Sequence, residues 1–283
     1  MAVRDVGSGP PVLLIHGIPG SAAVWEGVAT GLAARGFRAL APDLLGFGAS
    51  ERPKGVEPIW IDAQAAALAT YLDSVRCGPA IVVGHDYGVP ITVTLATRYP
   101  QLVKAVALAA GNLFPDTPIP APLRGVTVPV LGPVLSRVVM SGPSLRMMLR
   151  VGSGRPRPSL DPGIYTGDAD QVDAIGRIFS AALRELGPRY APVAQALPGL
   201  SVPRVVLWGD RDPFFPLDQG LRAARALGVE LTRAPGAGHF LPAERPGLFL
   251  DAVQDLHEQA RRGAPSQHVR ALGTPANGTW PPL

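Results

Sequence analysis

Short, nearly continuous runs of hydrophobic residues alternate along the chain with longer segments of helical periodicity. The hydrophobic runs predict strands at 12–16, 37–41, 80–83, 103–108, 204–208 and 229–232, and the periodic segments predict helices at 61–74, 89–98, 217–226 and 246–259. Strands that are apolar on both sides are typical of a parallel sheet whose two faces are covered by helices. The pattern therefore predicts an α/β fold with a mostly parallel sheet.

Two stretches interrupt this alternation. Between 113 and 198, prolines and glycines become frequent and only irregular helical pieces are expected. Because ligands of parallel sheets bind outside the carboxyl ends of the strands, an insertion of this length predicts a lid or cap, and a purely structural excursion is the alternative. Residues 263–283 are rich in Pro, Gly, Ala and Ser, which predicts a flexible C-terminal tail. We therefore expect two core parts, 1–112 and 199–262, around the lid.

Composition narrows the class of protein. Hydrophobic residues make up 47% of the 283 residues and charged residues 17%, which argues against a disordered chain. The single cysteine, Cys77, excludes a disulfide scaffold and a thiolate zinc site and is typical of a reducing compartment. No apolar run has the roughly 18 residues of a membrane span, and the N-terminus has no signal-like segment. We expect a cytoplasmic protein without a membrane partner, cofactor or metal.

The net charge of +4 comes mostly from arginine, since Lys54 and Lys104 are the only lysines. The arginines are scattered and form no basic stripe, so no nucleic-acid partner is predicted. Within the lid, 117–160 contains six arginines and no acidic residue, whereas 161–196 contains five acidic residues and three arginines. The two halves can neutralise each other. The alternative is that the basic half attracts an anionic or strongly polar small molecule, such as a functionalised natural-product intermediate.

The segment Gly84-His85-Asp86-Tyr87-Gly88 lies directly between a predicted strand and a predicted helix. Two glycines that flank a residue at such a turn are typical of a nucleophile elbow, in which the central side chain stands exposed above the sheet. Serine is the usual occupant, whereas this chain has Asp86. The N-terminus of the following helix would stabilise its carboxylate, and an N-capping aspartate is the structural alternative.

Two later motifs add an acid and a histidine. Asp212 lies in Gly209-Asp210-Arg211-Asp212-Pro213 after one predicted strand, and His239 lies in Gly238-His239-Phe240 after the last. The chain order of nucleophile, acid and histidine is that of a catalytic triad in hydrolases with a nucleophile elbow. We therefore predict that Asp86, Asp212 and His239 form a triad.

The motif His16-Gly17-Ile18-Pro19-Gly20 follows the first predicted strand. We predict that the backbone N–H groups of Ile18 and Tyr87 form an oxyanion hole. His16 and Asp43 are interpreted as hydrogen-bonding residues of their turns rather than as catalysts.

These motifs, together with Pro42-Asp43-Leu44-Leu45-Gly46-Phe47-Gly48-Ala49-Ser50, resemble the α/β-hydrolase superfamily from Pro11 to about residue 260. The resemblance is to its aspartate-nucleophile branch of epoxide hydrolases and haloalkane dehalogenases. It implies an α/β-hydrolase fold, with a mostly parallel sheet flanked by helices and a mainly helical lid inserted after the sixth strand. Members of this superfamily usually begin with an antiparallel hairpin. Only about ten residues precede the first predicted strand here, so we expect a shortened sheet edge.

A carboxylate nucleophile indicates displacement at a saturated carbon rather than attack on a carbonyl. Asp86 would form an alkyl-enzyme ester, and water activated by His239 would hydrolyse that ester while Asp212 orients the imidazole. Ordinary ester hydrolysis is disfavoured, because serine is the usual nucleophile for carbonyl carbon.

The resemblance also bears on the leaving group. Haloalkane dehalogenases hold the halide with a tryptophan after the nucleophile and an asparagine or second tryptophan, and fluoroacetate dehalogenases use two arginines after the nucleophile. This chain has Tyr87, Ile18 and Pro90 at the corresponding positions. Epoxide hydrolases use lid tyrosines as proton donors, and this lid contains Tyr165 and Tyr190. An epoxide hydrolase that yields a vicinal diol is therefore predicted. A haloalkane or haloacid dehalogenase is the alternative, and a non-hydrolytic or ligand-binding member of the fold is a further one.

Overall fold

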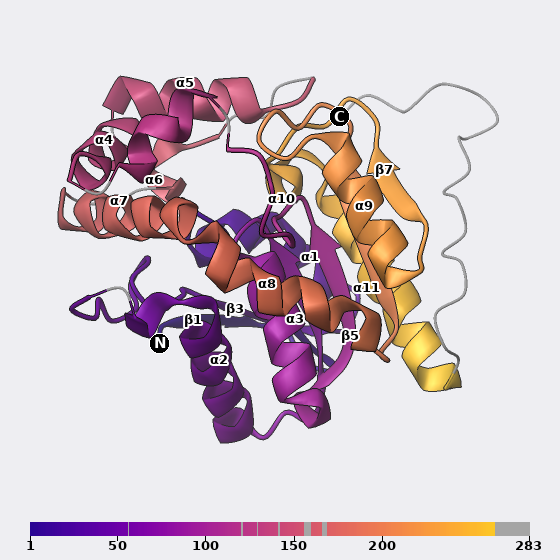
Figure 1. The fold of residues 1–283 in the computed structure, drawn as a ribbon. Helices are drawn as coiled ribbons and strands as arrows, with labels where there is room; N and C mark the ends of the chain where they lie inside the picture. Colours follow the sequence, from indigo (N-terminus) through magenta and orange to yellow (C-terminus); the bar gives the residue numbers. More distant parts are fainter. Residues whose placement is uncertain are drawn as a thin grey trace.

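The structure is a computed structural model that describes residues 1–263 apart from 56, 120, 129, 141, 156–159 and 166–168. Figure 1 shows a layered core with a group of helices above one end of its sheet. The expected C-terminal tail lies outside the described residues except for Gly263, which ends the last helix in a left-handed conformation.

One sheet of seven strands runs through the core in the order β1-β3-β2-β4-β5-β6-β7. The strands are β1 (Val3–Val6), β2 (Pro11–Ile15), β3 (Arg38–Pro42), β4 (Ala80–His85), β5 (Val103–Ala109), β6 (Arg204–Gly209) and β7 (Leu231–Ala234). All neighbouring strands are parallel except β1, which pairs antiparallel with β3 at the edge. The predicted mostly parallel sheet is confirmed.

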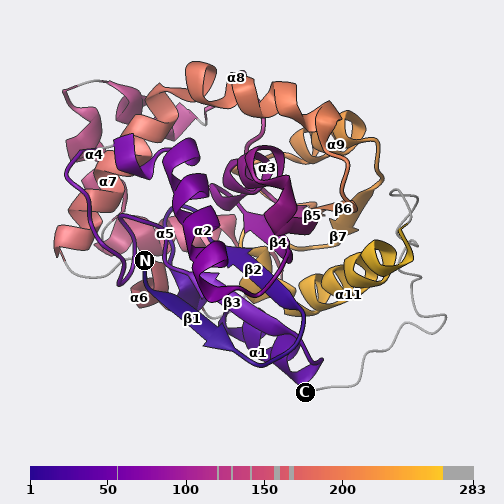
Figure 2. The ribbon, with the colours of Figure 1, turned by 90° about the horizontal axis from the view of Figure 1, so that it is seen from below.

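Helices cover both faces of this sheet. Those of the core are α1 (Glu26–Ala34), α2 (Ile61–Val75), α3 (Gly88–Arg98), α9 (Leu217–Leu227), α10 (Leu241–Glu244) and α11 (Pro246–Arg262), with 3-10 turns η1 (Ala22–Trp25), η2 (Glu57–Ile59) and η3 (Pro100–Leu102). Two further 3-10 turns, η4 (Ala121–Thr127) and η5 (Leu197–Gly199), lie between β5 and β6. Figure 2 shows α1 and α11 on one side of the sheet and α2, α3 and α9 on the other.

Alternate residues of the central strands pack into these two layers. In β2, Leu13 and Ile15 join the apolar cluster on one face, and Val12 and Leu14 join the cluster on the opposite face. Side chains of neighbouring strand residues point to opposite faces of a sheet, so a strand covered on both sides must be apolar at every position. This is the physical reason why the central strands are recognisable as continuous hydrophobic runs.

The lid helices lie between β5 and β6. They are α4 (Gly132–Val139), α5 (Gly142–Gly152), α6 (Pro162–Tyr165), α7 (Ala169–Arg184) and α8 (Leu186–Ala196). The expectation that the insertion follows the sixth strand is wrong, because it follows the fifth. The reason is the shortened edge of the sheet. A single antiparallel strand, β1, precedes β2, whereas a hairpin of two strands is usual in the superfamily that the motifs resemble.

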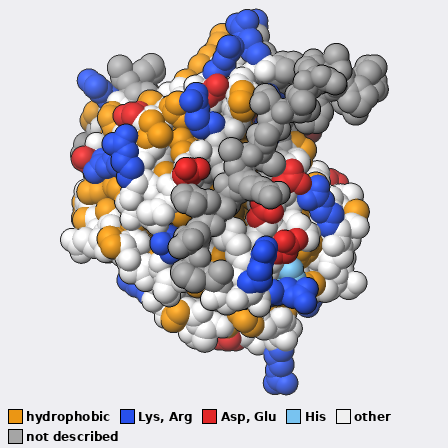
Figure 3. Space-filling view, turned by 90° about the vertical axis from the view of Figure 1, so that its right-hand side faces the viewer, with side chains coloured by type: hydrophobic (Ala, Val, Ile, Leu, Met, Phe, Trp, Pro, Cys, Tyr) orange, Lys and Arg blue, Asp and Glu red, His pale blue; other side chains and the backbone are white. Residues whose placement is uncertain are grey.

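Charges of both signs are spread over the surface. On the face seen in Figure 3, acidic and basic side chains are interspersed. Within the lid, Arg137 of the basic half pairs with Asp173 of the acidic half, so the two halves neutralise each other in part. None of the helices in the described ranges is long and apolar enough to cross a membrane.

Candidate active site

Asp86 lies at the sharp turn between β4 and α3. Its φ angle is 53°, a left-handed conformation that is rare for residues other than glycine. Two backbone hydrogen bonds hold the turn. The Asp86 N–H donates to the Ala109 carbonyl oxygen, and the Val89 N–H donates to the Asp86 carbonyl oxygen. A Cβ at Gly88 would collide with the Ile15 carbonyl oxygen, so this position requires glycine. The local structure is that of the predicted nucleophile elbow.

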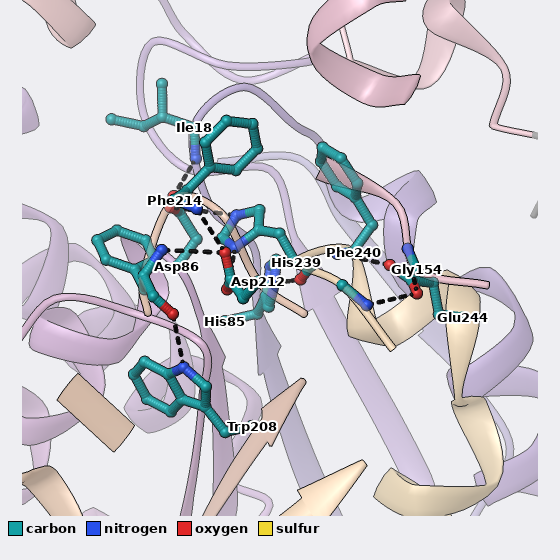
Figure 4. A network of polar contacts seen from close by, with 12 residues as sticks. Ile18, His85, Asp86, Gly154, Trp208, Asp212, Phe214, His239, Phe240 and Glu244 are labelled. Carbon is teal, nitrogen blue, oxygen red and sulfur yellow. Dashed lines mark hydrogen bonds and ion pairs between the residues drawn. The ribbon is translucent and has the colours of Figure 1, made fainter. Parts of the chain in front are cut away.

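The carboxylate of Asp86 lies between a backbone donor and an imidazole (Figure 4). The Ile18 N–H donates to Oδ1 at 2.6 Å, and Nε2 of His239 lies 3.6 Å from Oδ2. A Cβ at Gly17 would collide with the Asp86 side chain, so the loop after β2 can approach this closely only with glycine there. The structure thus puts the N–H of Ile18, a predicted oxyanion-hole donor, on the proposed nucleophile. That the Tyr87 N–H is the second donor of the oxyanion hole stays a prediction. The Tyr87 hydroxyl donates to the Ile59 carbonyl oxygen.

Asp212 orients the imidazole from its other side. Nδ1 of His239 lies 2.9 Å from Oδ2 of Asp212, whose side chain is fully buried. Oδ1 of Asp212 accepts from the N–H groups of Phe214 and Phe215 at 2.8 and 2.9 Å. Because the carboxylate has no proton to give, Nδ1 must carry the hydrogen of this bond. Nε2 is thereby directed at Asp86.

The two carboxylates govern the protonation of His239. Burial by itself lowers the pKa of the imidazole, but the charges and hydrogen bonds of Asp212 and Asp86 outweigh it and raise the pKa to about 10. Burial likewise opposes ionisation of Asp86, yet the hydrogen bond and charge of His239 bring the pKa of that carboxyl below its ordinary value. The free site therefore holds a histidine cation between two carboxylates.

His16 and Asp43 have the structural roles that were predicted. Nδ1 of His16 donates to the Gly17 carbonyl oxygen at 2.9 Å, and Nε2 accepts from the Leu44 N–H at 3.0 Å, which requires a neutral imidazole. Burial lowers the pKa of His16, in agreement with that form. Oδ1 and Oδ2 of Asp43 accept from the N–H groups of Ala22 and Ala49.

Two residues that the sequence reasoning passed over support the histidine loop. Nε2 of His85 donates to the His239 carbonyl oxygen at 2.8 Å, and burial followed by the nearby His239 lowers the pKa of His85 to about 4. The indole Nε1–H of Trp208 donates to the Phe215 carbonyl oxygen at 2.8 Å. This bond fixes the turn whose N–H groups hold Asp212. The sequence around His85 and Trp208 shows no feature that would mark either residue as a support of the histidine loop.

Glu244 is a third residue that was missed. Its buried carboxylate accepts from the N–H groups of Gly154, Gly238 and Phe240 at 2.9, 2.8 and 3.1 Å. The same lid segment is joined to the histidine loop by two backbone bonds, from the His239 N–H to Gly152 and from the Arg155 N–H to Gly236. An acidic residue five positions after the histidine, in the otherwise apolar stretch 240–243, is the signal that sequence reasoning could have used.

An apolar cavity opens above Asp86, under the lid. Its walls include Ile119, Leu123, Met140, Met148, Phe179, Leu183, Leu186, Tyr190, Phe214, Phe215 and Phe240. The space between these walls, together with open solvent at the mouth, amounts to about 860 Å³. None of the described residues that line it is an arginine or a lysine, and the paired Asp86 and His239 lie at its floor. The lining favours an apolar ligand and lends no support to an anionic one.

The two candidate lid tyrosines border different spaces. Tyr190 of α8 lines the large cavity together with Asp86, and burial, followed by the nearby Tyr87 and Asp86, raises its pKa well above the ordinary value. Tyr165 of α6 lines a smaller cavity that also touches Asp86 and His239, and burial raises its pKa as well. Both phenols therefore stay protonated at neutral pH.

Asn112 adds an unpaired amide to the wall of the large cavity. Its Oδ1 accepts from the Phe114 N–H at 2.9 Å and from the Thr117 hydroxyl at 2.5 Å. A backbone N–H can only donate, so this atom is the oxygen and the other is the NH₂ group. That buried Nδ2 has no partner within the described residues. The described part of the chain holds no cluster of three or more His, Cys, Asp or Glu residues that could bind a metal ion.

Residues 12–252 match the sequence profile of the alpha/beta hydrolase family. The chain belongs to this family. Haloalkane dehalogenase 2 of Mycobacterium tuberculosis is 28% identical over 264 residues, which cover 88% of each chain. Bifunctional epoxide hydrolase 2 of Sus scrofa is 34% identical over 120 residues, which cover 42% of this chain and 22% of that protein.

Solved structures share the fold. Haloalkane dehalogenase DbeA from Bradyrhizobium elkani superposes with a TM-score of 0.77 at 20% identity, covering 93% of this chain and 95% of that one. The epoxide hydrolase CorEH superposes with a TM-score of 0.67 at 20% identity, covering 90% and 94%. Both belong to the classes that the motifs resemble, and the predicted α/β-hydrolase fold is confirmed.

Proposed function

We propose that the protein is a hydrolase that opens epoxides through a covalent ester on Asp86. The observation that carries this proposal is a carboxylate at the nucleophile elbow, bonded to the Ile18 N–H through one oxygen and 3.6 Å from Nε2 of His239 through the other. A carboxylate is a suitable nucleophile for saturated carbon, where it displaces a leaving group. The haloalkane dehalogenase and epoxide hydrolase relatives support the same branch of the family.

In the first step, Oδ2 of Asp86 attacks a ring carbon of the epoxide, and the carbon–oxygen bond of the ring breaks. The oxygen keeps the bonding pair and takes a proton from the Tyr190 hydroxyl, which solvent later restores. Tyr190 is the better candidate donor than Tyr165 because it lines the same large cavity as Asp86. A buried phenol suits this task because it is neutral at pH 7. It is also a stronger acid than the alcohol that forms when the alkoxide takes its proton.

In the second step, His239 first releases its extra proton to solvent, because Asp86 is now an uncharged ester. Its Nε2 then removes a proton from water, and the hydroxide attacks Cγ of Asp86. Oδ1 carries the developing negative charge, and the Ile18 N–H is the donor that stabilises it. The bond between Cγ and Oδ2 then breaks, and His239 returns its proton to the departing diol oxygen. Asp212 stabilises the imidazolium throughout. The diol leaves with the former Oδ2, and the oxygen of water stays on Asp86.

The substrate class follows from the walls of the cavity. Aliphatic and aromatic side chains surround the floor, and the described lining contains no arginine or lysine. We propose an epoxide with lipophilic substituents.

Dehalogenation is a second candidate, supported by the 28% identity with haloalkane dehalogenase 2 and by the unpaired Nδ2 of Asn112 beside the cavity. Against it, no tryptophan is among the described residues that line either cavity at Asp86. A halide needs several well-aimed donors, because an unpaired buried anion is costly.

The test is a single turnover with enzyme in excess, in water enriched in the heavy oxygen isotope. Panels of lipophilic epoxides and of haloalkanes are compared. We expect diol from the epoxides, with the label on Asp86 and not in the diol. His239→Gln should accumulate the ester on Asp86, visible by mass spectrometry, whereas the control His257→Gln should turn over normally. Label in the diol would exclude the ester, and halide release without diol formation would establish the second candidate.

A further inference from the structure

The outer surface of the lid is unusually apolar. Eight of the eleven large hydrophobic side chains that are exposed in the described residues lie between 128 and 151. They are Val128, Val130, Leu131, Val134, Leu135, Val138, Met147 and Val151. Large exposed apolar patches mark interaction sites, whereas single exposed residues need no explanation.

The apolar side chains follow one side of α4. Leu131, Val134 and Leu135 recur at helical spacing and are 57%, 56% and 40% exposed. The inner side of α4 packs against α7 and η4. Of the described residues of α4, Gly132 and Ser136 are buried, whereas Val134, Leu135 and Val138 are exposed. The apolar side chains of this helix thus face solvent, which the packing of a soluble lid does not require.

Helix α5 repeats this arrangement. Met147 and Val151 lie one turn apart and are 59% and 54% exposed. On the inner side, Leu145 and Leu149 are buried and Met148 lines the large cavity. Two neighbouring methionines thus face opposite sides of the lid, one toward solvent and one toward the site.

Arginines flank the exposed apolar residues of α5. Arg146 and Arg150 lie next to Met147 and Val151 in the helix, are exposed, and make no ion pair within the described ranges. The stretch 117–160 contains no Asp or Glu at all. We call the exposed side chains of Leu131, Val134, Leu135, Met147 and Val151, with Arg146 and Arg150, the lid face.

We propose that the lid face docks onto a negatively charged phospholipid surface. Aliphatic side chains combined with arginines, on a stretch of chain without acidic residues, match what an anionic membrane interface binds, namely an apolar layer below phosphate headgroups. A second copy of the chain fits less well, because a symmetric dimer would bring Arg146 and Arg150 of both copies together without a counter-charge. The expectation of no membrane partner came from the lack of a spanning segment, which does not bear on surface binding.

Docking in this way would bring lid helices that border the apolar cavity next to a lipid phase. Met140 and Met148 belong to the same two-helix unit and line the cavity on its inner side. A lipophilic substrate could then enter from the membrane instead of from water. The proposal depends only on the lid surface, so its test uses binding and not catalysis.

The experiment is vesicle flotation with the full chain. Vesicles of phosphatidylcholine alone are compared with vesicles of phosphatidylcholine mixed with phosphatidylglycerol, at low and high salt. We expect binding to the mixed vesicles that salt weakens. Arg146→Gln with Arg150→Gln should lower the partition coefficient roughly 30-fold, and Val134→Ser with Leu135→Ser should lower it at least about tenfold. Leu221→Ser with Arg225→Gln, a similar exposed pair on α9, should bind like the wild type.

Circular dichroism establishes that each variant is folded, and sedimentation velocity measures its oligomeric state. Equal binding of the two lid variants and the wild type would overturn the proposal, as would a wild type that floats with neither kind of vesicle. A dimer that Val134→Ser with Leu135→Ser dissociates would also overturn it and would assign the lid face to self-association.

Discussion

Nε2 of His239 lies 3.6 Å from Oδ2 of Asp86, so the charge of the nucleophile sets the proton affinity of the base. In the free site, Asp86 and Asp212 together raise the pKa of His239 to about 10, against the lowering effect of burial. Once Asp86 is an ester, one of these two charges is gone. The pKa of His239 must then fall, and the imidazole can become the base that the second step needs. A single geometry thus serves both steps.

Replacing the nucleophile by its neutral isostere should reveal this coupling. In Asp86→Asn the charge beside Nε2 is absent, so we expect the pKa of His239 to be clearly lower than in the wild type. NMR of the imidazole signals across a pH titration measures it. Asp210→Asn is the matched control, because Asp210 bonds the Gly236 N–H and not the imidazole. An unchanged pKa in Asp86→Asn would contradict the coupling.

The raised pKa of His239 also has a consequence for stability. An unfolded histidine has a pKa of about 6.5, whereas the folded value is about 10. Between these values the native state holds a proton that the unfolded state has released. The contribution of His239 to the free energy of unfolding is therefore full below about pH 6.5 and is lost as pH rises toward 10. Urea unfolding should therefore give a free energy that falls over this window more steeply for the wild type than for His239→Gln. Parallel curves for the two proteins would refute the expectation.

The two lid tyrosines should differ in their kinetic effect. Tyr190 lines the cavity above Asp86 and Tyr165 lines the smaller one, so only Tyr190→Phe should slow the alkylation step, by about 10²- to 10⁴-fold. Rapid-quench measurement of ester formation on an epoxide isolates that step. Tyr165→Phe is the matched control. Wild-type alkylation by both variants would mean that another group protonates the oxygen.

The central strands and the triad could be predicted from the sequence because each depends on local rules. Burial on both faces makes β4 apolar from Ala80 to Val83, and the elbow requires small residues around Asp86. Strand β1 was missed because it lies at the sheet edge, where three of its four residues are exposed and the apolar signal is absent. Helix α1 was missed for a related reason, since its small residues Gly and Ala blur the helical periodicity.

The support of the triad could not be predicted, because it depends on contacts between distant segments. The carboxylate of Glu244 binds Gly154, which is 90 residues away in the chain, and His85 binds the carbonyl oxygen of His239, which is 154 residues away. No spacing rule relates such pairs. The position of the lid relative to the histidine loop is likewise a result of tertiary packing.

Glu244 provides the most demanding prediction, because it joins the lid to the catalytic loop. Its carboxylate bonds Gly154 of the lid and Gly238 and Phe240, which are the two neighbours of His239 in the chain. In Glu244→Gln one oxygen becomes an NH₂ group that cannot accept from these N–H donors. We expect a loss of about 1–3 kcal/mol in the free energy of unfolding, as for other bonds to a buried charged group.

A purely structural role would lower stability and leave the chemistry of the folded enzyme unchanged. A positioning role makes a different prediction, because the histidine acts only in the second step of the proposed reaction. Glu244→Gln should therefore hydrolyse the ester on Asp86 more slowly than the wild type while forming it at a similar rate, so the ester accumulates during turnover. Mass spectrometry during steady-state turnover detects this accumulation. Glu258→Gln on the surface of α11 is the control and should leave both steps unchanged. If Glu244→Gln slows both steps equally, or slows neither, the carboxylate stabilises the fold without positioning His239.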